Sequence, residues 1–208
     1  MRGIMCLVSG VVLGAALGAG LWAWIEPTTL TSPPAFDETS YLPQGMWADL
    51  DGDCQDTRTE VLLALGLDVE LDAEECRIAS GVWQDMFTGQ KLSNPADVVI
   101  VHIVPLLAAH ESGAWAWDGS RKQAFANSYV HATSMSLRPK PPLTSNLATA
   151  SLATMQAKQG NNIIGWVPER HNKKCAYTEN WVTIKAKWEL AMNEAESKRV
   201  SEILALCP

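Results

Sequence analysis

The sequence lacks several features that would assign it at once to a known class. It has no Cys-x-x-Cys spacing, which argues against a zinc site, and it has no internal repeat. Phe and Tyr are scarce at three each, whereas Trp occurs nine times. We interpret the tryptophans as large side chains of the core, with stacking on a ligand as the alternative. Charged residues make up 19% and hydrophobic residues 47%, as in a globular rather than a disordered chain. A chain of 208 residues is long enough for one domain with a substantial core.

Basic residues are scarce in the first part of the chain. Residues 1–90 contain 14 acidic and 3 basic residues, for a net charge of −11. Residues 91–208 contain 9 acidic and 13 basic residues, for a net charge of +4. Because phosphate contacts require Lys and Arg, a nucleic-acid partner would bind the second part. The overall net charge of −7 argues against tight DNA binding.

The N-terminal 25 residues have the composition of a targeting segment. Arg2 precedes an apolar run over residues 3–25 that is long for a signal-peptide core and just long enough to cross a bilayer. Small residues that suit peptidase cleavage are present at Ala16, Gly18, Ala19, Gly20 and Ala23. We interpret the segment as a cleaved signal peptide, with an uncleaved membrane anchor as the alternative. The predicted localisation is secreted and extracellular, and a membrane is a partner only if the segment stays attached.

Three regions follow from this pattern. Residues 1–25 are the signal peptide or membrane anchor, residues 26–45 form a linker rich in Pro, Thr and Ser, and residues 46–208 form the domain. Beyond Cys6 in the targeting segment, four cysteines remain, and an even number in an exported domain predicts two disulfides. Three pairings are possible, and we favour Cys54–Cys76 with Cys175–Cys207 because each would close a local unit.

Local patterns predict a mixture of helices and short strands. Four consecutive β-branched residues predict a strand over residues 97–102, and residues 76–83 are expected to be extended. Residues 85–89 are expected to form a turn, and the Pro-rich stretch 129–145 a loop. The helices predicted from apolar spacing and end signals cover residues 57–65, 105–111, 120–127 and 147–158, with one or two more over residues 179–206.

An acidic stretch near residue 50 has the spacing of a calcium-binding loop. Asp49, Asp51, Asp53 and Glu60 match the first, third, fifth and twelfth positions of such a loop. The sixth position requires a sharp turn and is normally Gly, but here it is Cys54, which opposes calcium binding. The alternative is an acidic loop that caps the helix beginning at Thr57.

His102 is the residue that best suits proton transfer. It ends the predicted strand and precedes a predicted helix, and such a junction would hold an imidazole rigidly for work as a general base. The alternative is a hydrogen-bonded histidine of the core. His110, His131 and His171 have no matching spacing and are expected at the surface.

Ten motifs in a fixed order carry a resemblance to a known family. They cover roughly residues 46–207, and the four cysteines of the predicted domain occupy the expected places. In this order the chain resembles the exported HNH-endonuclease family related to the C-terminal domain of GmrSD-type restriction enzymes. The motifs are Asp51-Gly-Asp-Cys-Gln-Asp-Thr-Arg-Thr-Glu-Val-Leu62, Cys76-Arg-Ile-Ala-Ser-Gly-Val-Trp83, Phe87-Thr-Gly89, His102-Ile-Val-Pro-Leu106, Ser112-Gly-Ala-Trp115, Phe125-Ala-Asn127, Lys158, Trp166-Val-Pro168, Cys175-Ala-Tyr177 and Trp181-Val182.

The resemblance implies an α+β fold with a ββα-metal (HNH-like) nuclease core, elaborated with helices and two disulfides. It further implies that His102 activates water, that Asn146 braces the metal loop and that Lys158 belongs to the same site. A divalent cation, usually magnesium, would be held by an Asp before the His and an Asn on the following helix, and would stabilise charge on the phosphate.

The sequence departs from the family where the cation would bind. The Asp before His102 is Val101, a second acid two residues earlier is Val99, and the helix Asn corresponds to Met155. The Gly that follows Lys158 in the family is Gln159. Hydrocarbon and thioether groups are poor ligands for a hard cation, so no metal ligand is predicted and hydrolysis is expected to be impaired.

Three functions remain open from the sequence. The first is an active secreted nuclease that acts on DNA or RNA with magnesium held by other acids, such as Glu111 or Asp97. The second, which the apolar substitutions favour, is a pseudoenzyme: an extracellular binding module on the nuclease fold, with no cofactor and with an unknown protein or ligand as partner. The third is a calcium-binding module built on residues 49–60.

Overall fold

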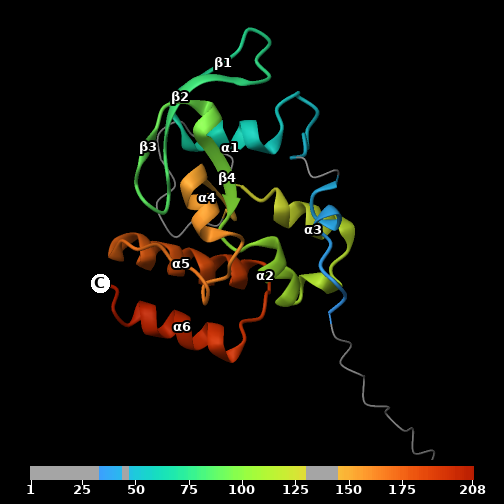
Figure 1. Cartoon of the computed structure of the whole chain (residues 1–208). Coiled ribbons are helices and arrows are strands. Elements are labelled where there is room, and N and C mark those ends of the chain that lie inside the picture. The colour runs from blue at the N-terminus through green and yellow to red at the C-terminus, as the bar shows by residue number, and fades with distance from the viewer. Residues whose placement is uncertain (1–32, 44–46, 130–144) are drawn as a thin grey trace, which may run out of the picture. The chain divides into compact units, whose positions relative to one another are not determined.

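The computed structural model describes residues 33–43, 47–129 and 145–208, which belong to one compact unit that begins at Pro33 (Figure 1). Its described part is an α+β fold with small antiparallel sheets and two disulfides, as predicted. The strands are β1 (Leu67–Leu71), β2 (Ile78–Gln84), β3 (Lys91–Leu92), β4 (Val98–His102) and β5 (Leu147–Ser151). The α-helices are α1 (Thr57–Leu65), α2 (Leu106–Glu111), α3 (Gly119–Ala126), α4 (Leu152–Lys158), α5 (His171–Lys187) and α6 (Glu194–Leu204). Single 3-10 turns are η1 (Glu38–Ser40), η3 (Pro95–Asp97) and η4 (Ala114–Ala116).

Two separate antiparallel sheets position the helices. β1, β2 and β3 form one sheet in that order, and the β1–β2 hairpin lies at the end opposite to α5 and α6 in Figure 1. β4 and β5 form the other sheet, with Val101 opposite Ala148 and His102 opposite Leu147. The two sheets are joined where the Met86 amide donates to the Thr149 carbonyl and the Thr149 hydroxyl donates to the Gln84 carbonyl.

The helix predicted over residues 147–158 is wrong in its first part. Residues 147–151 form β5, and only residues 152–158 are helical. Every residue of β5 is buried, so the strand shows no polar alternation that would distinguish it from a buried helix. The helix begins where the Ser151 side chain accepts a hydrogen bond from the Thr154 amide, which makes Ser151 its N-cap.

Other element boundaries follow from capping and packing. The first helix is capped one residue before the expected Thr57, because the Asp56 side chain accepts from the Thr59 amide. The C-terminal helical region is two helices, and the first of them begins at His171 rather than at Glu179. α6 starts at the cap provided by Asn193, which accepts from the Glu196 amide. The loop predicted over residues 129–145 lies almost wholly outside the described residues.

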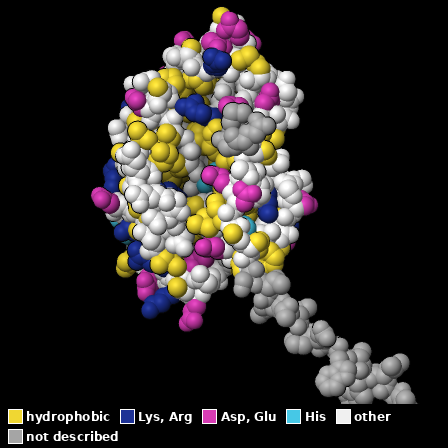
Figure 2. All heavy atoms as spheres, turned by 45° about the vertical axis from the view of Figure 1, so that its right-hand side comes forward, with side chains coloured by type: hydrophobic (Ala, Val, Ile, Leu, Met, Phe, Trp, Pro, Cys, Tyr) yellow, Lys and Arg dark blue, Asp and Glu magenta, His cyan; other side chains and the backbone are white. Residues whose placement is uncertain are grey.

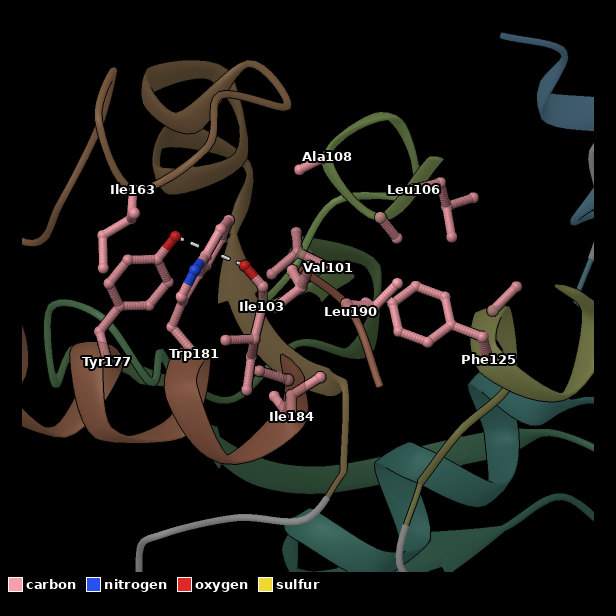
Figure 3. Packing of buried hydrophobic residues seen from close by; sticks show 14 of the residues in the cluster. Val101, Ile103, Leu106, Ala108, Phe125, Ile163, Tyr177, Trp181, Ile184 and Leu190 are labelled. Carbon is pink, nitrogen blue, oxygen red and sulfur yellow. Dashed lines mark hydrogen bonds between the residues drawn. The ribbon is translucent and has the colours of Figure 1, made fainter. Parts of the chain in front are cut away.

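The main core lies where β4, β5, α2, α3, α5 and α6 meet. Tyr177, Trp181 and Ile184 project from one face of α5 towards Ile103, and the Tyr177 hydroxyl donates to the Ile103 carbonyl (Figure 3). Trp181 is fully buried, in keeping with the interpretation of tryptophans as core residues. Burying a side chain of this size contributes roughly 3 kcal/mol or more relative to its exposure. A smaller cluster around Leu62 and Trp83 packs α1 on β2.

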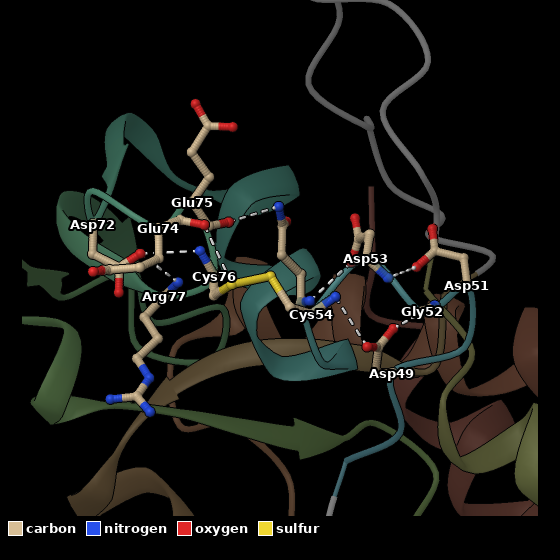
Figure 4. The surroundings of a disulfide bond; sticks show 11 residues. Asp49, Asp51, Gly52, Asp53, Cys54, Asp72, Glu74, Glu75, Cys76 and Arg77 are labelled. Carbon is tan, nitrogen blue, oxygen red and sulfur yellow. Dashed lines mark hydrogen bonds between the residues drawn. A yellow bond between two sulfur atoms is a disulfide. The ribbon is translucent and has the colours of Figure 1, made fainter.

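The two disulfides have the pairing that the sequence favoured. Cys54 is bonded to Cys76, and Cys175 is bonded to Cys207. The first bond ties the acidic loop before α1 to the end of the β1–β2 hairpin (Figure 4). Cys54 has φ of +75°, so it adopts the left-handed turn that was expected to require glycine and forms the disulfide as well. Cys54 therefore makes the sharp turn without glycine.

Residues 33–43 are part of the folded unit, whereas the sequence assigned them to a linker. Tyr41 is fully buried, and its hydroxyl donates to His110 Nδ1 across 3.2 Å, because the Pro34 carbonyl accepts from Nε2 and leaves the lone pair of the neutral ring on Nδ1. On the other side of the ring, His110 Nε2–H donates to the Pro34 carbonyl at 2.9 Å. The prediction that His110 lies at the surface is wrong, since the side chain is buried and fastens this segment to α2. His171 is exposed, and His131 lies outside the described residues.

Candidate functional site

One pocket of about 340 Å³ collects most of the residues that the sequence singled out. Its lining includes Val101 and His102 from β4 and Met155 and Lys158 from α4. The imidazole and the helix therefore face each other across a shared pocket, in agreement with the order of motifs in the sequence. The remaining lining residues come from η1 and its approach, from β4, from the start of α2 and from the end of α4: Phe36, Glu38, Ile100, Pro105, Leu106, Leu107, Gln159 and Gly160.

His102 is held in one tautomer. Its Nε2 lies 2.8 Å from the Ala126 carbonyl oxygen. Because a carbonyl can only accept, Nε2 carries the proton and Nδ1 keeps a lone pair. The Trp47 ring lies beside the imidazole, with 5.6 Å between centroids and 35° between planes. Burial, and to a smaller extent the charge of Lys158, lower the pKa of His102 to about 4, so the ring is a neutral base at neutral pH.

Lys158 brings the second functional group to the pocket. It is 3% exposed, and its Nζ donates to the Asn161 carbonyl at 3.3 Å. Burial lowers the pKa of Lys158 to about 7. The ammonium group therefore exchanges its proton near neutral pH, which an exposed lysine does not do.

Asn146 lies behind the pocket and does not line it. Its side chain is fully buried and brackets Val104, accepting from the Val104 amide at 2.9 Å and donating to the Val104 carbonyl at 3.1 Å. The Asn146 carbonyl also accepts from the Ile103 amide. These bonds fix the chain between β4 and α2, so Asn146 holds the loop that follows His102 and does not touch the space in which a ligand would bind.

The pocket offers few oxygen donors for a cation. Val101 and Met155 contribute only hydrocarbon and thioether groups, and Val99 is not part of the lining. The alternative acids that the sequence suggested are wrong, since Glu111 faces a different cavity and Asp97 lies in η3, before β4. The carboxylate that does line the pocket is Glu38, on the N-terminal segment.

The acidic loop has carboxylates close together but already engaged. One oxygen from each of Asp49, Asp51 and Asp53 lies within 4.8 Å of the others, and all three residues are exposed. The Asp49 carboxylate accepts from the amides of Gly52 and Cys54 (Figure 4). These bonds fix the shape of the loop, and the N-cap of α1 is the next acidic residue, Asp56.

A buried aspartate that the sequence did not single out organises the other side of α4. Asp85 is fully buried and accepts five hydrogen bonds. Two come from backbone amides in its own turn, and three come from Ser151 and Thr154 at the start of α4. The sequence identified the turn over residues 85–89, but partners 66 and 69 residues away leave no local pattern.

Charge is segregated on the surface as the sequence indicated. Figure 2 shows acidic side chains at the end of the molecule that carries the β1–β2 hairpin, where Asp68, Glu70, Glu74 and Glu75 are exposed. The basic residue that lines the candidate site, by contrast, is Lys158 of α4. The hairpin would therefore repel a polyanion.

The fold and the two disulfides define a class of exported, disulfide-bonded α+β proteins. The chain is similar to an uncharacterized secreted protein of Arthroderma benhamiae (strain ATCC MYA-4681 / CBS 112371), with 30% identity over 161 residues that cover 77% of this chain and 72% of that protein. The chain therefore belongs to the same family as that secreted fungal protein. No family model matches the sequence, and no solved structure matches it.

The predicted secreted, extracellular localisation is confirmed, because the relative is a secreted protein and both disulfides form. In the described part of the chain, no helix combines the length and apolar character needed to cross a bilayer. The targeting segment over residues 1–25 lies outside the described residues.

Proposed function

We propose that this secreted protein binds nucleic-acid phosphodiesters at the His102 pocket and is an impaired member of the HNH-endonuclease family. The observation that carries the proposal is the pairing of a neutral, fixed imidazole with a buried lysine in one pocket. The imidazole can accept a proton at Nδ1, and the ammonium group of Lys158 can neutralise a phosphate oxygen.

The order of the elements around the pocket supports a ββα-type core. β4 ends at His102 and pairs antiparallel with β5, from which α2, η4 and α3 separate it in the chain, and α4 follows β5 directly. The expected bracing Asn is Asn146, and its amide holds the chain after His102 from behind. This arrangement is what the resemblance to the nuclease family implied for these residues.

The residues present do not fit a magnesium ion. A hard cation of this kind needs near-octahedral oxygen coordination, and the two positions that should supply it are Val101 and Met155. The positive charge of Lys158 in the same pocket would further oppose a cation. The proposed chemistry therefore uses only side chains of the chain itself.

The remaining chemistry is slow hydrolysis assisted by two groups. His102 Nδ1 would take the proton of a water molecule as its oxygen attacks phosphorus. The bond from phosphorus to the leaving oxygen would break, and the leaving oxygen would take a proton from solvent. Lys158 would stabilise the added negative charge on the phosphate. Without a Lewis acid on the leaving oxygen, the rate should be far below that of a metal-dependent nuclease.

Nicking of supercoiled plasmid tests this proposal. We expect slow nicking that is insensitive to chelator and that falls about 100-fold in His102→Ala, as for loss of a general base. His171→Ala is the matched control, because His171 is exposed and outside the pocket, and its rate should not change. Restoring the oxygens in Val101→Asp with Met155→Asn should raise the rate in magnesium by at least about tenfold.

A second function is favoured by the apolar rim of the same pocket. Leu107 and Met155 are both more than one-third exposed beside His102, and Val101 lines the pocket as a hydrocarbon group. This lining suits a binding module that holds a ligand without cutting it. If neither the wild type nor the Val101→Asp, Met155→Asn double variant nicks the plasmid, the result favours the binding module and overturns the impaired-nuclease proposal.

The pH dependence of binding provides a separate prediction. Because the pKa of Lys158 is about 7, its charge is present at pH 6 and mostly absent at pH 8, whereas His102 stays neutral over this range. We expect the affinity for a fluorescent oligonucleotide in chelator to fall about tenfold from pH 6 to pH 8, the value of one charge-assisted contact. The Lys158→Met variant should bind weakly and lose most of this dependence. If the affinity of the Lys158→Met variant depends on pH as strongly as that of the wild type, the dependence comes from groups other than Lys158.

A further inference from the structure

A second cavity lies on the other side of α4. It has a volume of about 330 Å³. The helix presents Ala153, Thr154 and Ala157 to it, whereas Met155 and Lys158 face the His102 pocket. Since residues two apart in a helix point in nearly opposite directions, α4 is the wall between the two cavities. The width of a helix with its side chains, about 10 Å, therefore sets the distance between them.

The far wall of this cavity is aromatic and rigid. Trp166 lines it and is half-buried. The indole packs edge to face against Phe87 at 5.4 Å and against Tyr177 at 5.6 Å between centroids. Phe87 is itself part of the lining. A flat apolar ring could therefore enter against a surface that loses little side-chain entropy on binding.

Two cations lie next to this aromatic wall without ion-pair partners among the described residues. Arg170 lines the cavity, and its Nη1 donates to the Thr88 carbonyl. Lys173 lies close by, since both side chains approach Gly89, at 3.2 Å and 3.5 Å from where a Cβ would stand. Burial and then the charge of Arg170 lower the pKa of Lys173, although Asp85 opposes them.

The nearby acids offset this charge only in part, since Asp85 attracts Lys173 without forming an ion pair with it. Asp85 is engaged by its five hydrogen bonds, and Glu169 lines the cavity without an ion pair to either cation. The residue at the start of α5, Arg170, also provides no side-chain cap for the first amides of the helix. An anion placed between Arg170 and Lys173 would relieve their mutual repulsion.

We propose that the Trp166 cavity binds one nucleotide of a single-stranded nucleic acid, with the base against Trp166 and its phosphate at Arg170 and Lys173. This inference rests on the proposed function, because the same strand would cross α4 and place a neighbouring phosphodiester at His102. The separation of the cavities by one helix width corresponds to a short step along such a strand. Aromatic side chains combined with cations are the common chemistry of single-strand recognition.

Binding in chelator tests the inference without relying on cleavage. The probe is thymidine 5′-monophosphate, measured by displacement of fluorescein-labelled hexathymidylate. We expect Trp166→Leu and Ala157→Trp each to weaken the monophosphate at least tenfold, the first by removing the stacking surface and the second by filling the cavity. Gln156→Trp is the matched control, because the neighbouring Gln156 is exposed on α4 and lines neither cavity, and its affinity should stay within twofold. The Ala157 variant keeps the test decisive if Trp166→Leu fails to fold.

Charge is tested separately from stacking. Arg170→Gln with Lys173→Gln should weaken the monophosphate at least tenfold but leave thymidine unchanged, whereas Lys198→Gln on α6 should have no effect. Equal affinity for thymidine and its monophosphate, or displacement by inorganic phosphate at the same concentration as the nucleotide, would overturn the inference.

The two proposals fail in different ways. If hexathymidylate binding depends on Lys158 but not on Trp166 or Ala157, the nucleotide cavity is wrong and the proposed function stands. If the monophosphate binds at Trp166 while His102 and Lys158 variants leave hexathymidylate binding and nicking unchanged, the proposed function is wrong and the cavity stands.

Discussion

Replacing Asp85 with Asn is expected to lower the free energy of unfolding by about 4 kcal/mol. The carboxylate is fully buried and is the acceptor for five donors, two of them on its own turn and three at the junction of β5 and α4. The amide group of Asn can accept on one side only, so its NH₂ group would face the Ser151 amide, which cannot reverse its hydrogen bond. Each buried donor that loses its partner costs about 1–3 kcal/mol, and bonds to a charged acceptor lie at the upper end.

The pH dependence distinguishes this loss from a simple packing defect. Burial raises the pKa of Asp85, but the hydrogen bonds lower it by more, so the folded-state pKa lies below its ordinary value. The stabilisation is therefore present above the unfolded pKa of about 3.9 and is lost as the pH falls through the folded pKa. The difference between wild type and variant should shrink in strongly acidic solution.

Urea unfolding at pH 7 and at pH 3, with the disulfides intact, measures both effects. Asp97→Asn is the matched control, because Asp97 is exposed in η3, and it should change stability by no more than about 0.5 kcal/mol. A loss below about 1 kcal/mol at pH 7 for Asp85→Asn would contradict the role given to this carboxylate.

Replacing Lys185 with Met is expected to destabilise the fold by about 4 kcal/mol. Lys185 and Glu196 form an ion pair at 2.6 Å between α5 and α6, with side chains only 2% and 5% exposed. Lys185 also donates to the Ser112 hydroxyl and the Ala191 carbonyl, and the Trp181 indole donates to Glu196. Removing the cation alone would leave the Glu196 carboxylate buried without a countercharge, which costs about 3–5 kcal/mol.

A double change shows whether the cost comes from the unpaired charge. Burial lowers the pKa of Lys185 more than attraction to Glu196 raises it, so desolvation offsets much of what the pair gains. Lys185→Met with Glu196→Leu should therefore recover most of the stability that the single change loses. Glu189→Gln, which breaks the exposed pair with Arg121, should cost at most about 1 kcal/mol. If the double variant is no more stable than Lys185→Met, the loss lies in packing and not in charge.

Local patterns in the sequence were sufficient to predict part of the fold. The β-branched run predicted β4, and the short separations of the cysteines favoured the observed pairing. β5 was missed because a strand buried on both faces, built here of small residues, has no alternation. The burial of His110 was missed because its partners Tyr41 and Pro34 lie about seventy residues earlier in the chain.

The candidate site could be predicted only through the order of motifs. Nothing local to His102 indicates that Met155 and Lys158 face it, since the pairing of β4 with β5 brings them together. Glu38 and Trp47 were not predicted near His102, because each reaches it from a segment with no periodic pattern, and Trp166 was named only as part of a motif. Glu111 and Asp97 were wrongly proposed as alternative ligands because their distance from His102 depends on tertiary structure, which the sequence does not give.

The attachment of residues 33–43 makes the processing of the precursor relevant to the site itself. Phe36 and Glu38 form part of the rim around His102, and the hydrogen bonds of His110 with Tyr41 and Pro34 hold this segment in place. Cleavage on the N-terminal side of Pro33 would preserve this rim. Cleavage on the C-terminal side of Glu38 would widen the entrance of the His102 pocket and remove the Glu38 carboxylate from it. Cleavage in this segment could thus alter which ligands the pocket admits without changing any of the lining residues on β4 or α4.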